Sequence, residues 1–328
     1  MAGVQASALA IAVSNAGGLG SLPCALLGSD ALKQELAVLR AGTAKPFNVN
    51  FFCHAVPAAN AAREAAWRAA LRPYYDELGL DPNDVPAGPG RAPFSSEAVD
   101  ALESVRPAVV SFHFGLPEAG QLARLRAWSA KIIASATTVE EARWLEARGV
   151  DAIIAQGVEA GGHRGMFLSD DPTTQVGTFA LLPQVVRAVQ VPVIAAGGIA
   201  SAEGVAAALA LGAAGVQVGT AYLLCPEATT SALHRAALAS PAAAHTALTN
   251  LFSGRPARSI VNRVMRELGP MSAAPSEFPL ATAAIAPLRA AAERRGSVDF
   301  SPLWSGQNAS GCKAIPAAQL TRELAARL

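Results

Sequence analysis

A glycine-rich loop carrying one histidine lies near the middle of the chain. Residues 151–155 read as a buried strand and are followed by the run QGVEAGGHRG at 156–165. Glycines let the backbone approach a flat or phosphorylated ligand, and a histidine titrates near neutral pH. We therefore expect a binding site at this loop, with His163 able to exchange a proton. Taken alone, the motif is also compatible with a plain glycine-rich turn and a solvated histidine.

Two further glycine loops follow the last two predicted strands. They are AAGGI at 195–199 and QVGTA at 217–221. In α/β barrels, the loops after the last two strands commonly form a phosphate site from backbone N–H groups. Gly197, Gly198 and Gly219 would expose such groups, and the Thr220 hydroxyl would add a donor. Either loop alone reads as a tight turn, but the two together favour a phosphate site.

The rest of the chain predicts the scaffold that positions these loops. Short β-rich apolar runs alternate with alanine-rich stretches of helical period, which is typical of a parallel sheet with helices packed outside it. The pattern predicts strands at 19–22, 47–51, 109–112, 132–134, 152–155, 193–196 and 215–218, and helices such as 7–16, 31–40, 139–148 and 203–211. Similar loops after every strand, without an opening GxGxxG, favour an α/β fold of the TIM (β/α)₈ barrel type.

The predicted barrel lacks one strand at its beginning. The chain passes from MAG at 1–3 directly into a helix, so we expect the first strand to be missing and the natural start to lie upstream. We predict three parts: the barrel at 1–226, a smaller helical cap at 227–300, and a segment at 301–328 that returns to the barrel and ends in a helix. Segment 58–93, with its Pro/Gly cluster at 81–93, is predicted to be a surface excursion.

The composition limits the class of partner. The chain has 328 residues, 52% of them hydrophobic, and a formal net charge of +1 without a basic stripe, which argues against nucleic acid and acidic membranes. It has neither a secretion signal nor the roughly 18 to 20 apolar residues that span a bilayer. Four scattered cysteines without CxxC indicate reduced thiols rather than a metal site. We expect a cytoplasmic protein with a small-molecule substrate, either a monomer or a homodimer.

An asparagine at the end of a strand suggests the kind of ligand. Asn50, Gln156 and the backbone of Ala2 and Gly3 could hydrogen-bond the N and O edges of a flavin whose phosphate lies at the two glycine loops. FMN therefore fits the pattern. Taken singly, Asn50 could only cap a loop and Gln156 could only bond the backbone.

Through these motifs, the chain resembles the nitronate monooxygenases, formerly called 2-nitropropane dioxygenases. These enzymes are FMN-dependent barrel oxidoreductases. The resemblance covers nearly the whole chain and rests on MAG at 1–3, SNAGGLG at 14–20, SFHFG at 111–115, the GGH loop, 195–199, 217–220 and LWSGQ at 303–307. In that family the MAG segment ends the first strand, which agrees with the strand count. Together, the residues and the resemblance give these expected FMN contacts: Ala2, Gly3, Asn50, Gln156, Gly161, Gly162, Gly197, Gly198, Gln217, Val218, Gly219 and Thr220.

The resemblance also implies that His163 is a catalytic base. A neutral imidazole close to an acidic α-carbon can remove its proton and turn a nitroalkane into its nitronate. A nitronate, such as propionate 3-nitronate, needs no base; in the family it passes an electron to FMN, and reaction with O₂ releases nitrite. His113 is expected to face the same cavity and to donate a hydrogen bond to the nitro group, with a strand-end cap as the alternative.

Several other side chains receive smaller roles. Glu159 is expected to bond loop backbone, and Trp304 to pack over the cofactor edge or close the cap, while His54, His234 and His245 are assigned no role. Two other functions remain open: an NAD(P)H-dependent quinone or enoyl-thioester reductase of the same superfamily, and a flavin-binding protein without turnover. The SFHFG segment at 111–115 favours the nitronate enzyme.

Overall fold

The computed structural model describes residues 2–85 and 91–328, so Met1 of the MAG motif and part of the Pro/Gly cluster at 81–93 lie outside it. The strands are β1 (Gly20–Pro23), β2 (Phe47–Phe52), β3 (Val109–His113), β4 (Lys131–Ala136), β5 (Ala152–Gln156), β6 (Gly162–His163), β7 (Val193–Ala196), β8 (Gly215–Gln217), β9 (Thr246–Thr249) and β10 (Ala257–Ile260). The α-helices are α1 (Ser7–Asn15), α2 (Ser29–Gly42), α3 (Ala61–Leu78), α4 (Ser96–Glu103), α5 (Ala119–Arg126), α6 (Val139–Glu146), α7 (Thr178–Ala188), α8 (Ala202–Ala210), α9 (Ala232–Leu238), α10 (Arg263–Leu268), α11 (Ala281–Arg294) and α12 (Ala317–Leu324). Three short 3₁₀ helices lie at Pro172–Thr174, Thr220–Leu224 and Pro241–Ala244.

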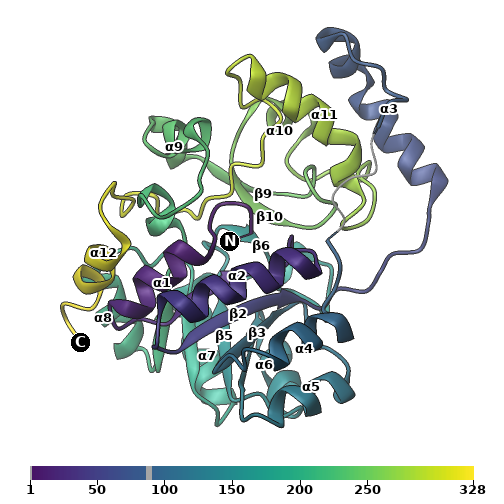
Figure 1. The fold of residues 1–328 in the computed structure, drawn as a ribbon. Helices are drawn as coiled ribbons and strands as arrows, with labels where there is room; N and C mark the ends of the chain where they lie inside the picture. Colours follow the sequence, from purple (N-terminus) through teal and green to yellow (C-terminus); the bar gives the residue numbers. More distant parts are fainter. Residues whose placement is uncertain (1, 86–90) are drawn as a thin grey trace.

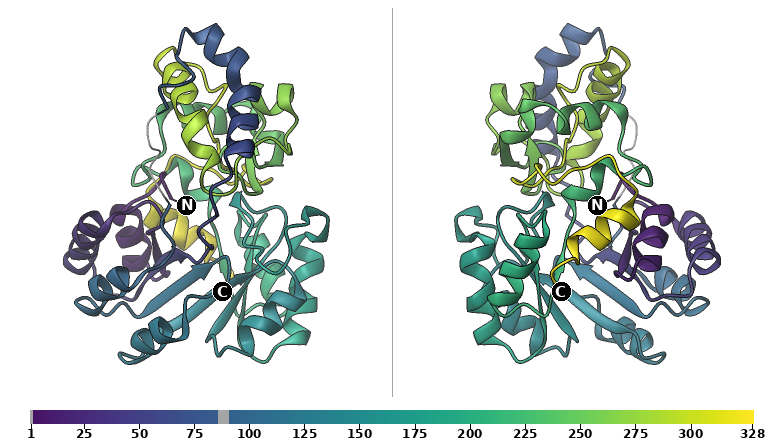
Figure 2. Two further views of the ribbon diagram at one scale, coloured as in Figure 1. Left: turned by 90° about the vertical axis from the view of Figure 1, so that its right-hand side faces the viewer. Right: turned by 90° about the vertical axis from the view of Figure 1, so that its left-hand side faces the viewer.

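A curled parallel sheet of seven strands forms one layer of the molecule (Figure 1). Its order is β1-β2-β3-β4-β5-β7-β8, and each neighbouring pair is parallel. All seven strands predicted from the sequence are confirmed, and the helices between them cover the outer face in the manner of a TIM barrel (Figures 1 and 2). Within residues 2–85 and 91–328, β1 and β8 do not pair and form the two edges of the sheet.

The two faces of this sheet differ in polarity. Side chains alternate along a strand, so Val49 and Val110, both fully buried, belong to the apolar core shared with the outer helices. Asn48, Asn50 and Ser111 project to the opposite, inner face, where they line a cavity. The apolar face therefore fixes the helices, and the polar face is available for a ligand.

The cap contains strands as well as helices. β6, β10 and β9 form a small antiparallel sheet in that order, and α9, α10 and α11 complete the unit. The sequence pattern predicts only helices at 227–300; these helices are present, and the two four-residue strands β9 and β10 are additional. Strands this short give too few alternating positions for a period of two to be recognised.

Helix α3, which comes from the predicted surface excursion, packs beside α11 in the cap (Figures 1 and 2). The Trp67 indole N–H donates to the Ala281 carbonyl at 3.0 Å, and the Tyr75 hydroxyl donates to the Ala284 carbonyl at 2.6 Å. Both aromatic side chains are buried. The excursion therefore supplies part of the cap core, because its apolar face finds α11 about 210 residues later in the chain.

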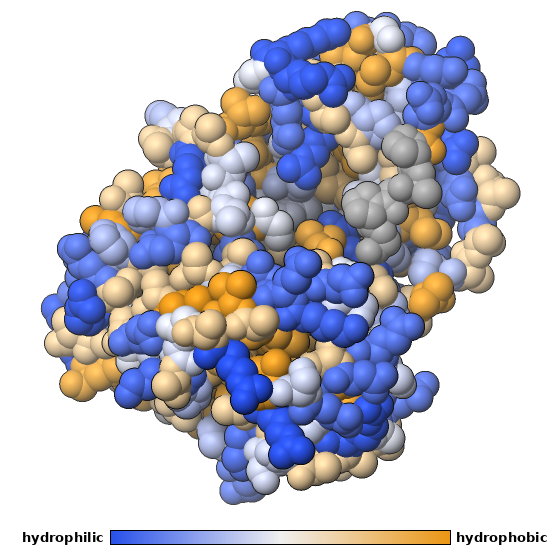
Figure 3. All heavy atoms as spheres, viewed as in Figure 1, coloured by the Kyte–Doolittle hydropathy of each residue, from blue (hydrophilic) through white to orange (hydrophobic). Residues whose placement is uncertain are grey.

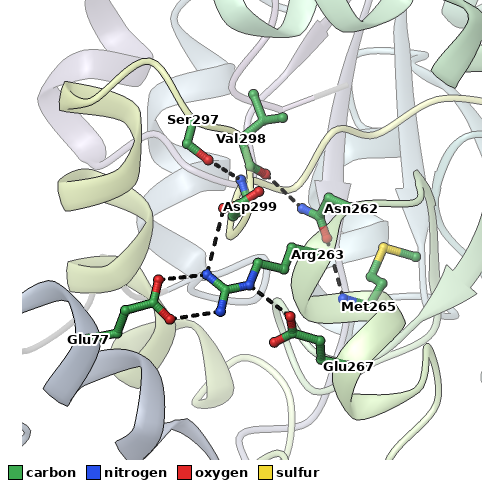
Figure 4. A network of polar contacts seen from close by, with 8 residues as sticks. All are labelled: Glu77, Asn262, Arg263, Met265, Glu267, Ser297, Val298 and Asp299. Atoms are coloured by element: carbon green, nitrogen blue, oxygen red, sulfur yellow. Dashed lines mark hydrogen bonds and ion pairs between the residues drawn. The ribbon is translucent and has the colours of Figure 1, made fainter.

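Polar contacts on the other side of α3 join it to α10 (Figure 4). The Arg263 guanidinium binds both carboxylate oxygens of Glu77 at 2.7 Å and the carboxylate of Glu267 at 2.8 Å. Asp299 lies 3.9 Å from the same guanidinium. Arg263 thus links α3, α10 and the segment after α11.

The last helix of the chain packs against helices of the barrel. Helix α12 packs on α1 and α8, and its buried residues include Leu320 and Leu324 (Figure 1). Among residues 2–85 and 91–328, no helix is both long and apolar enough to cross a membrane.

Candidate active site

A cavity of about 630 Å³ lies at the carboxyl ends of the sheet strands, where the molecular surface is hollowed below the cap (Figure 3). Both predicted catalytic histidines, His113 and His163, line it. So do all the expected cofactor residues except Gly3, namely Ala2, Asn50, Gln156, Gly161, Gly162, Gly197, Gly198, Gln217, Val218, Gly219 and Thr220. Positions far apart in the sequence therefore meet around one space.

The glycines of the GGH loop are required by close backbone contacts. A Cβ at Gly161 would lie 2.5 Å from the backbone nitrogen of Gly306, and Gly162 has a φ of +73°, in the left-handed region. A side chain is sterically excluded at the first position and strained at the second. Gly162 and His163 then form β6 and pair with β10, so the loop is held between the barrel and the cap.

The Gln156 side chain forms two hydrogen bonds with the backbone of the GGH loop. Its side-chain amide donates to the His163 carbonyl at 3.0 Å and accepts from the Gly165 N–H at 2.8 Å. The bond to backbone considered from the sequence is thus present, and Gln156 also borders the cavity. These two hydrogen bonds position the backbone of His163.

Arg164, which the sequence reasoning did not single out, is fully buried beneath the same loop. Its guanidinium donates to the carbonyls of Gln156 and Gly157 at 2.6 and 2.7 Å, and its Nε donates to the Gln175 side-chain oxygen at 2.8 Å. These bonds satisfy acceptors at the end of β5, and the Gly157 carbonyl also accepts from the Ala160 N–H at 3.1 Å. Its position directly after the histidine, in a segment rich in glycine, is the signal that could have marked it.

Three aromatic side chains lie close to the His163 imidazole. Ring centroids of Phe278, Trp304 and Phe52 lie 5.3, 5.4 and 5.9 Å from the imidazole centroid. Burial lowers the pKa of His163 well below its ordinary value, and the positive charge of Arg91 lowers it further. The imidazole is therefore neutral at neutral pH, the form that can accept a proton.

One hydrogen bond orients the His163 ring. Its Nε2 lies 2.8 Å from the hydroxyl of Ser253, a cap residue that the sequence did not reveal. The same hydroxyl lies 3.4 Å from the Arg255 carbonyl, which can only accept. With the hydroxyl hydrogen directed to that carbonyl, Nε2 donates to Ser253 and Nδ1 carries the free lone pair.

His113 is bound to the same loop. Its Nε2 lies 3.1 Å from the His163 carbonyl oxygen, and since a carbonyl only accepts, the ring proton resides on Nε2. Burial lowers the pKa of His113 to about 4, so the ring is neutral and Nδ1 is an acceptor. The donation to a nitro group expected from the sequence therefore requires His113 to exchange its bond with the loop.

The inner face of the sheet adds a polar cluster beneath this part of the cavity. Asn50 and Asn48 each donate to the Ser111 hydroxyl at 2.8 Å, and Asn48 also donates to the Ser21 hydroxyl at 2.7 Å. The Asn48 side-chain oxygen is buried and has no partner among the residues described. Asn48 was missed in the sequence, although its spacing of two from Asn50 places both on one face of a strand.

The two glycine loops expected to bind phosphate are closed by segment 303–308. The Gly306 N–H donates to the Thr220 hydroxyl at 2.9 Å, and the Asn308 amide donates to the Gly198 carbonyl at 2.8 Å. Gly197 and Gly198 have φ of +116° and +72°. A Cβ at Gly219 would meet no described atom within 4 Å, so its backbone stands beside open space.

The remaining expectations concern supporting residues. The Glu159 carboxylate accepts from the backbone N–H and the hydroxyl of Thr178 at 2.8 Å, so the expected bond to loop backbone is confirmed. His54 is buried against Phe278, with ring centroids 4.8 Å apart. His234 is buried in α9. Across the described part of the chain, no group of three or more His, Cys, Asp or Glu could hold a metal ion.

Comparison with known proteins identifies relatives over the full length. The nitronate monooxygenase family pattern matches residues 1–327. Nitronate monooxygenases of Pseudomonas aeruginosa and Paraburkholderia phytofirmans are each 44% identical, over 100% and 99% of this chain and 94% and 89% of theirs. A solved nitroalkane oxidase from Streptomyces ansochromogenes is 41% identical with a TM-score of 0.90, covering 100% of this chain and 93% of that one.

Proposed function

Because the chain belongs to the nitronate monooxygenase family, we propose that it binds FMN in the 630 Å³ cavity and oxidises alkyl nitronates with O₂. The observation that carries this proposal is the position of His163, neutral and surrounded by aromatic rings at the cavity wall. A neutral imidazole has the free lone pair that can accept the proton of a carbon acid at neutral pH.

The residues present fit an FMN group. The unpartnered Asn48 oxygen can accept from a ring N–H, while the Asn50 and Gln156 side chains lie on the same side of the cavity. Ala2, Gly161 and Gly162 are proposed to border the ring. Backbone N–H groups of Gly197, Gly198 and Gln217 through Thr220 are proposed to hold the phosphate. Gly3 does not line the cavity.

The chemistry divides between cofactor and protein. Bound FMN supplies the redox step, accepting an electron from the nitronate and passing it to O₂. The protein supplies the proton step: Nδ1 of His163 takes the α-proton of a neutral nitroalkane, and Ser253 steadies the opposite nitrogen. His113 is proposed to donate to the nitro end after its Nε2–H leaves the His163 carbonyl. The aromatic rings around His163 exclude water from this step.

The cap is proposed to act as the substrate unit. We assign residues 1–226 to the FMN-binding barrel, 227–300 to the cap and 301–328 to the returning segment, and we add α3 to the cap on the basis of its packing against α11. The cap delivers Ser253 and Phe278, and the returning segment delivers Trp304, to the histidine carried by the barrel loop. Substrate is therefore bound between two units that share β6.

The test is purification followed by an oxygen assay. We expect a yellow protein whose released flavin is FMN, and oxygen consumption with propyl 1-nitronate. Anaerobic mixing with the nitronate should reduce the flavin, which is seen as a change in its absorbance spectrum. A colourless protein, or a flavin reduced by NADH or NADPH but not by nitronate, would contradict the proposal, and the second result would favour a reductase instead.

A further inference from the structure

Arg91 is a cation at the cavity wall without an acidic partner. It lines the cavity that also contains His163, and it follows residues 86–90 directly. One guanidinium nitrogen donates to the Thr282 hydroxyl at 2.8 Å. No carboxylate in the described structure lies within 4.0 Å of the guanidinium, and the sequence PAGPG at 86–90 contains no acidic residue.

Arg91 and His163 share an aromatic neighbour. The Arg91 guanidinium carbon lies 5.8 Å from the centroid of Phe278, and that centroid lies 5.3 Å from the His163 ring. The Arg91 guanidinium and the His163 imidazole are therefore both neighbours of the Phe278 ring. A substrate with its reacting carbon at His163 and a chain a few atoms long would bring its far end toward Arg91.

A second guanidinium increases the positive potential here. Arg255 lies over the Phe114 ring at 4.3 Å, and its nearest acidic group, the fully exposed Asp170, is 3.9 Å away. Its Nε is buried without a partner in the described structure. A half-buried cation is stabilised when a ligand supplies the opposite charge. Arg91, which lines the cavity without a described carboxylate within 4.0 Å, therefore favours an anionic ligand, and Arg255 adds positive charge behind Phe114.

We propose that Arg91 is a specificity-determining residue that binds a carboxylate at the far end of the nitronate substrate, with Arg255 adding positive potential behind Phe114. The phosphate site proposed above lies at the glycine loops after β7 and β8, so the cofactor does not account for Arg91. A guanidinium offers paired N–H donors that match the planar oxygens of a carboxylate. This inference rests on the proposed nitronate activity and assigns a residue to the recognition of the far end of the substrate.

The test compares two substrates that differ only at this end. Propionate 3-nitronate carries a carboxylate where propyl 1-nitronate carries a methyl group. We expect the wild type to favour the first in kcat/KM, and Arg91→Met to reduce that preference by about 10- to 100-fold, the effect of losing a partly desolvated charge pair. Arg91→Lys should retain part of the preference. Arg266→Met, the same change at an exposed cap arginine, should leave it unaltered.

Two unreactive inhibitors give a second readout without turnover. Succinate and butyrate have the shapes of the two nitronates, with a carboxylate in place of the nitronate group. Succinate should inhibit the wild type more strongly, and Arg91→Met should remove the difference. Equal loss of kcat/KM on both nitronates in Arg91→Met, or an unchanged succinate-to-butyrate ratio, would overturn the role of Arg91 while leaving the nitronate activity intact. A wild type inert to both nitronates would instead refute the proposed function.

Discussion

At the scale of single residues, we expect His163 to be required for one class of substrate only. We expect His163→Asn to lower kcat/KM for 1-nitropropane by about 10²- to 10⁴-fold, the usual contribution of a general base. Propyl 1-nitronate is already ionised, so most of its turnover should survive. Steady-state oxygen consumption with both substrates measures the difference. Equal losses would show that His163 acts in binding or in the redox step.

The pH dependence of the same residue has a definite sign. Burial lowers the pKa of His163 below the ordinary 6.5, so the basic form persists as the pH falls through that value. For 1-nitropropane, kcat/KM should stay level between about pH 8 and about pH 6.5 and decline only at lower pH. A decline centred at the ordinary histidine pKa would show that the imidazole is solvated in the working enzyme.

Arg164 positions the loop that carries the base. Arg164→Met removes the guanidinium donors to the Gln156 and Gly157 carbonyls, at about 1–3 kcal/mol for a buried group that loses its partner. We expect a lower free energy of unfolding and a lower kcat on 1-nitropropane, with a smaller kcat loss on propyl 1-nitronate. Arg164→Lys keeps the charge and should recover part of both. Urea unfolding and kinetics together test this, and unchanged kcat in a destabilised Arg164→Met would limit Arg164 to a stabilising role.

The sequence revealed the residues whose type is itself a signal. Glycines at 161–162 and 197–198 and the histidine at 163 indicate a site. Glycine lets the backbone approach a ligand, and histidine titrates near neutral pH. Ser253 and Phe278 gave no such signal, since a serine or a phenylalanine 90 or more residues away becomes part of the site only when β10 pairs with β6. Contacts of this kind depend on tertiary pairing, which local pattern does not encode.

At the scale of elements, predictability follows length and periodicity. The seven barrel strands were predictable because apolar runs alternate regularly with helices. Helix α3 was not, although it has 18 residues, because Pro73 lies inside it and prolines and glycines follow it. Proline normally argues against a helix interior. The contacts of Trp67 and Tyr75 with α11 stabilise this helix in spite of Pro73.

The contribution of α3 can be measured at its buried anchor. Trp67→Ala removes a side chain that is 1% exposed and its bond to Ala281, so we expect a loss of about 3–5 kcal/mol in the free energy of unfolding. Glu77→Gln on the same helix is the control: it weakens an exposed ion pair with Arg263, which solvent already screens. Urea midpoints close together for the two variants would show that α3 is not part of the cap core.

At the scale of the whole molecule, the site depends on two units joined by one strand. The barrel supplies Gln156, Arg164 and the glycine loops, the cap supplies Ser253 and Phe278, and the returning segment supplies Trp304. His163 belongs to both, because β6 leaves the barrel and pairs with β10. This shared strand couples the folding of the cap to the position of the base. We therefore expect acid to destabilise the whole fold and to disrupt the site at the same time.

Four histidines with lowered pKa values determine the direction of this acid sensitivity. Burial lowers the pKa of His54, His113 and His234 to about 4 and that of His163 well below its ordinary value. Below about pH 6.5 the unfolded chain binds more protons than the folded one, so the free energy of unfolding falls as the pH falls, by up to about 1.4 kcal/mol per pH unit for each histidine.

Urea unfolding at about pH 7 and about pH 5 measures this slope, in a range where the carboxylates remain ionised. We expect a clear loss of stability at the lower pH. His54→Phe should reduce the loss, because a phenyl ring can pack against Phe114 and Phe278 without binding a proton. Equal stability at both pH values would mean that these imidazoles protonate inside the folded protein, and His163 would then be charged and unable to act as a base at about pH 5.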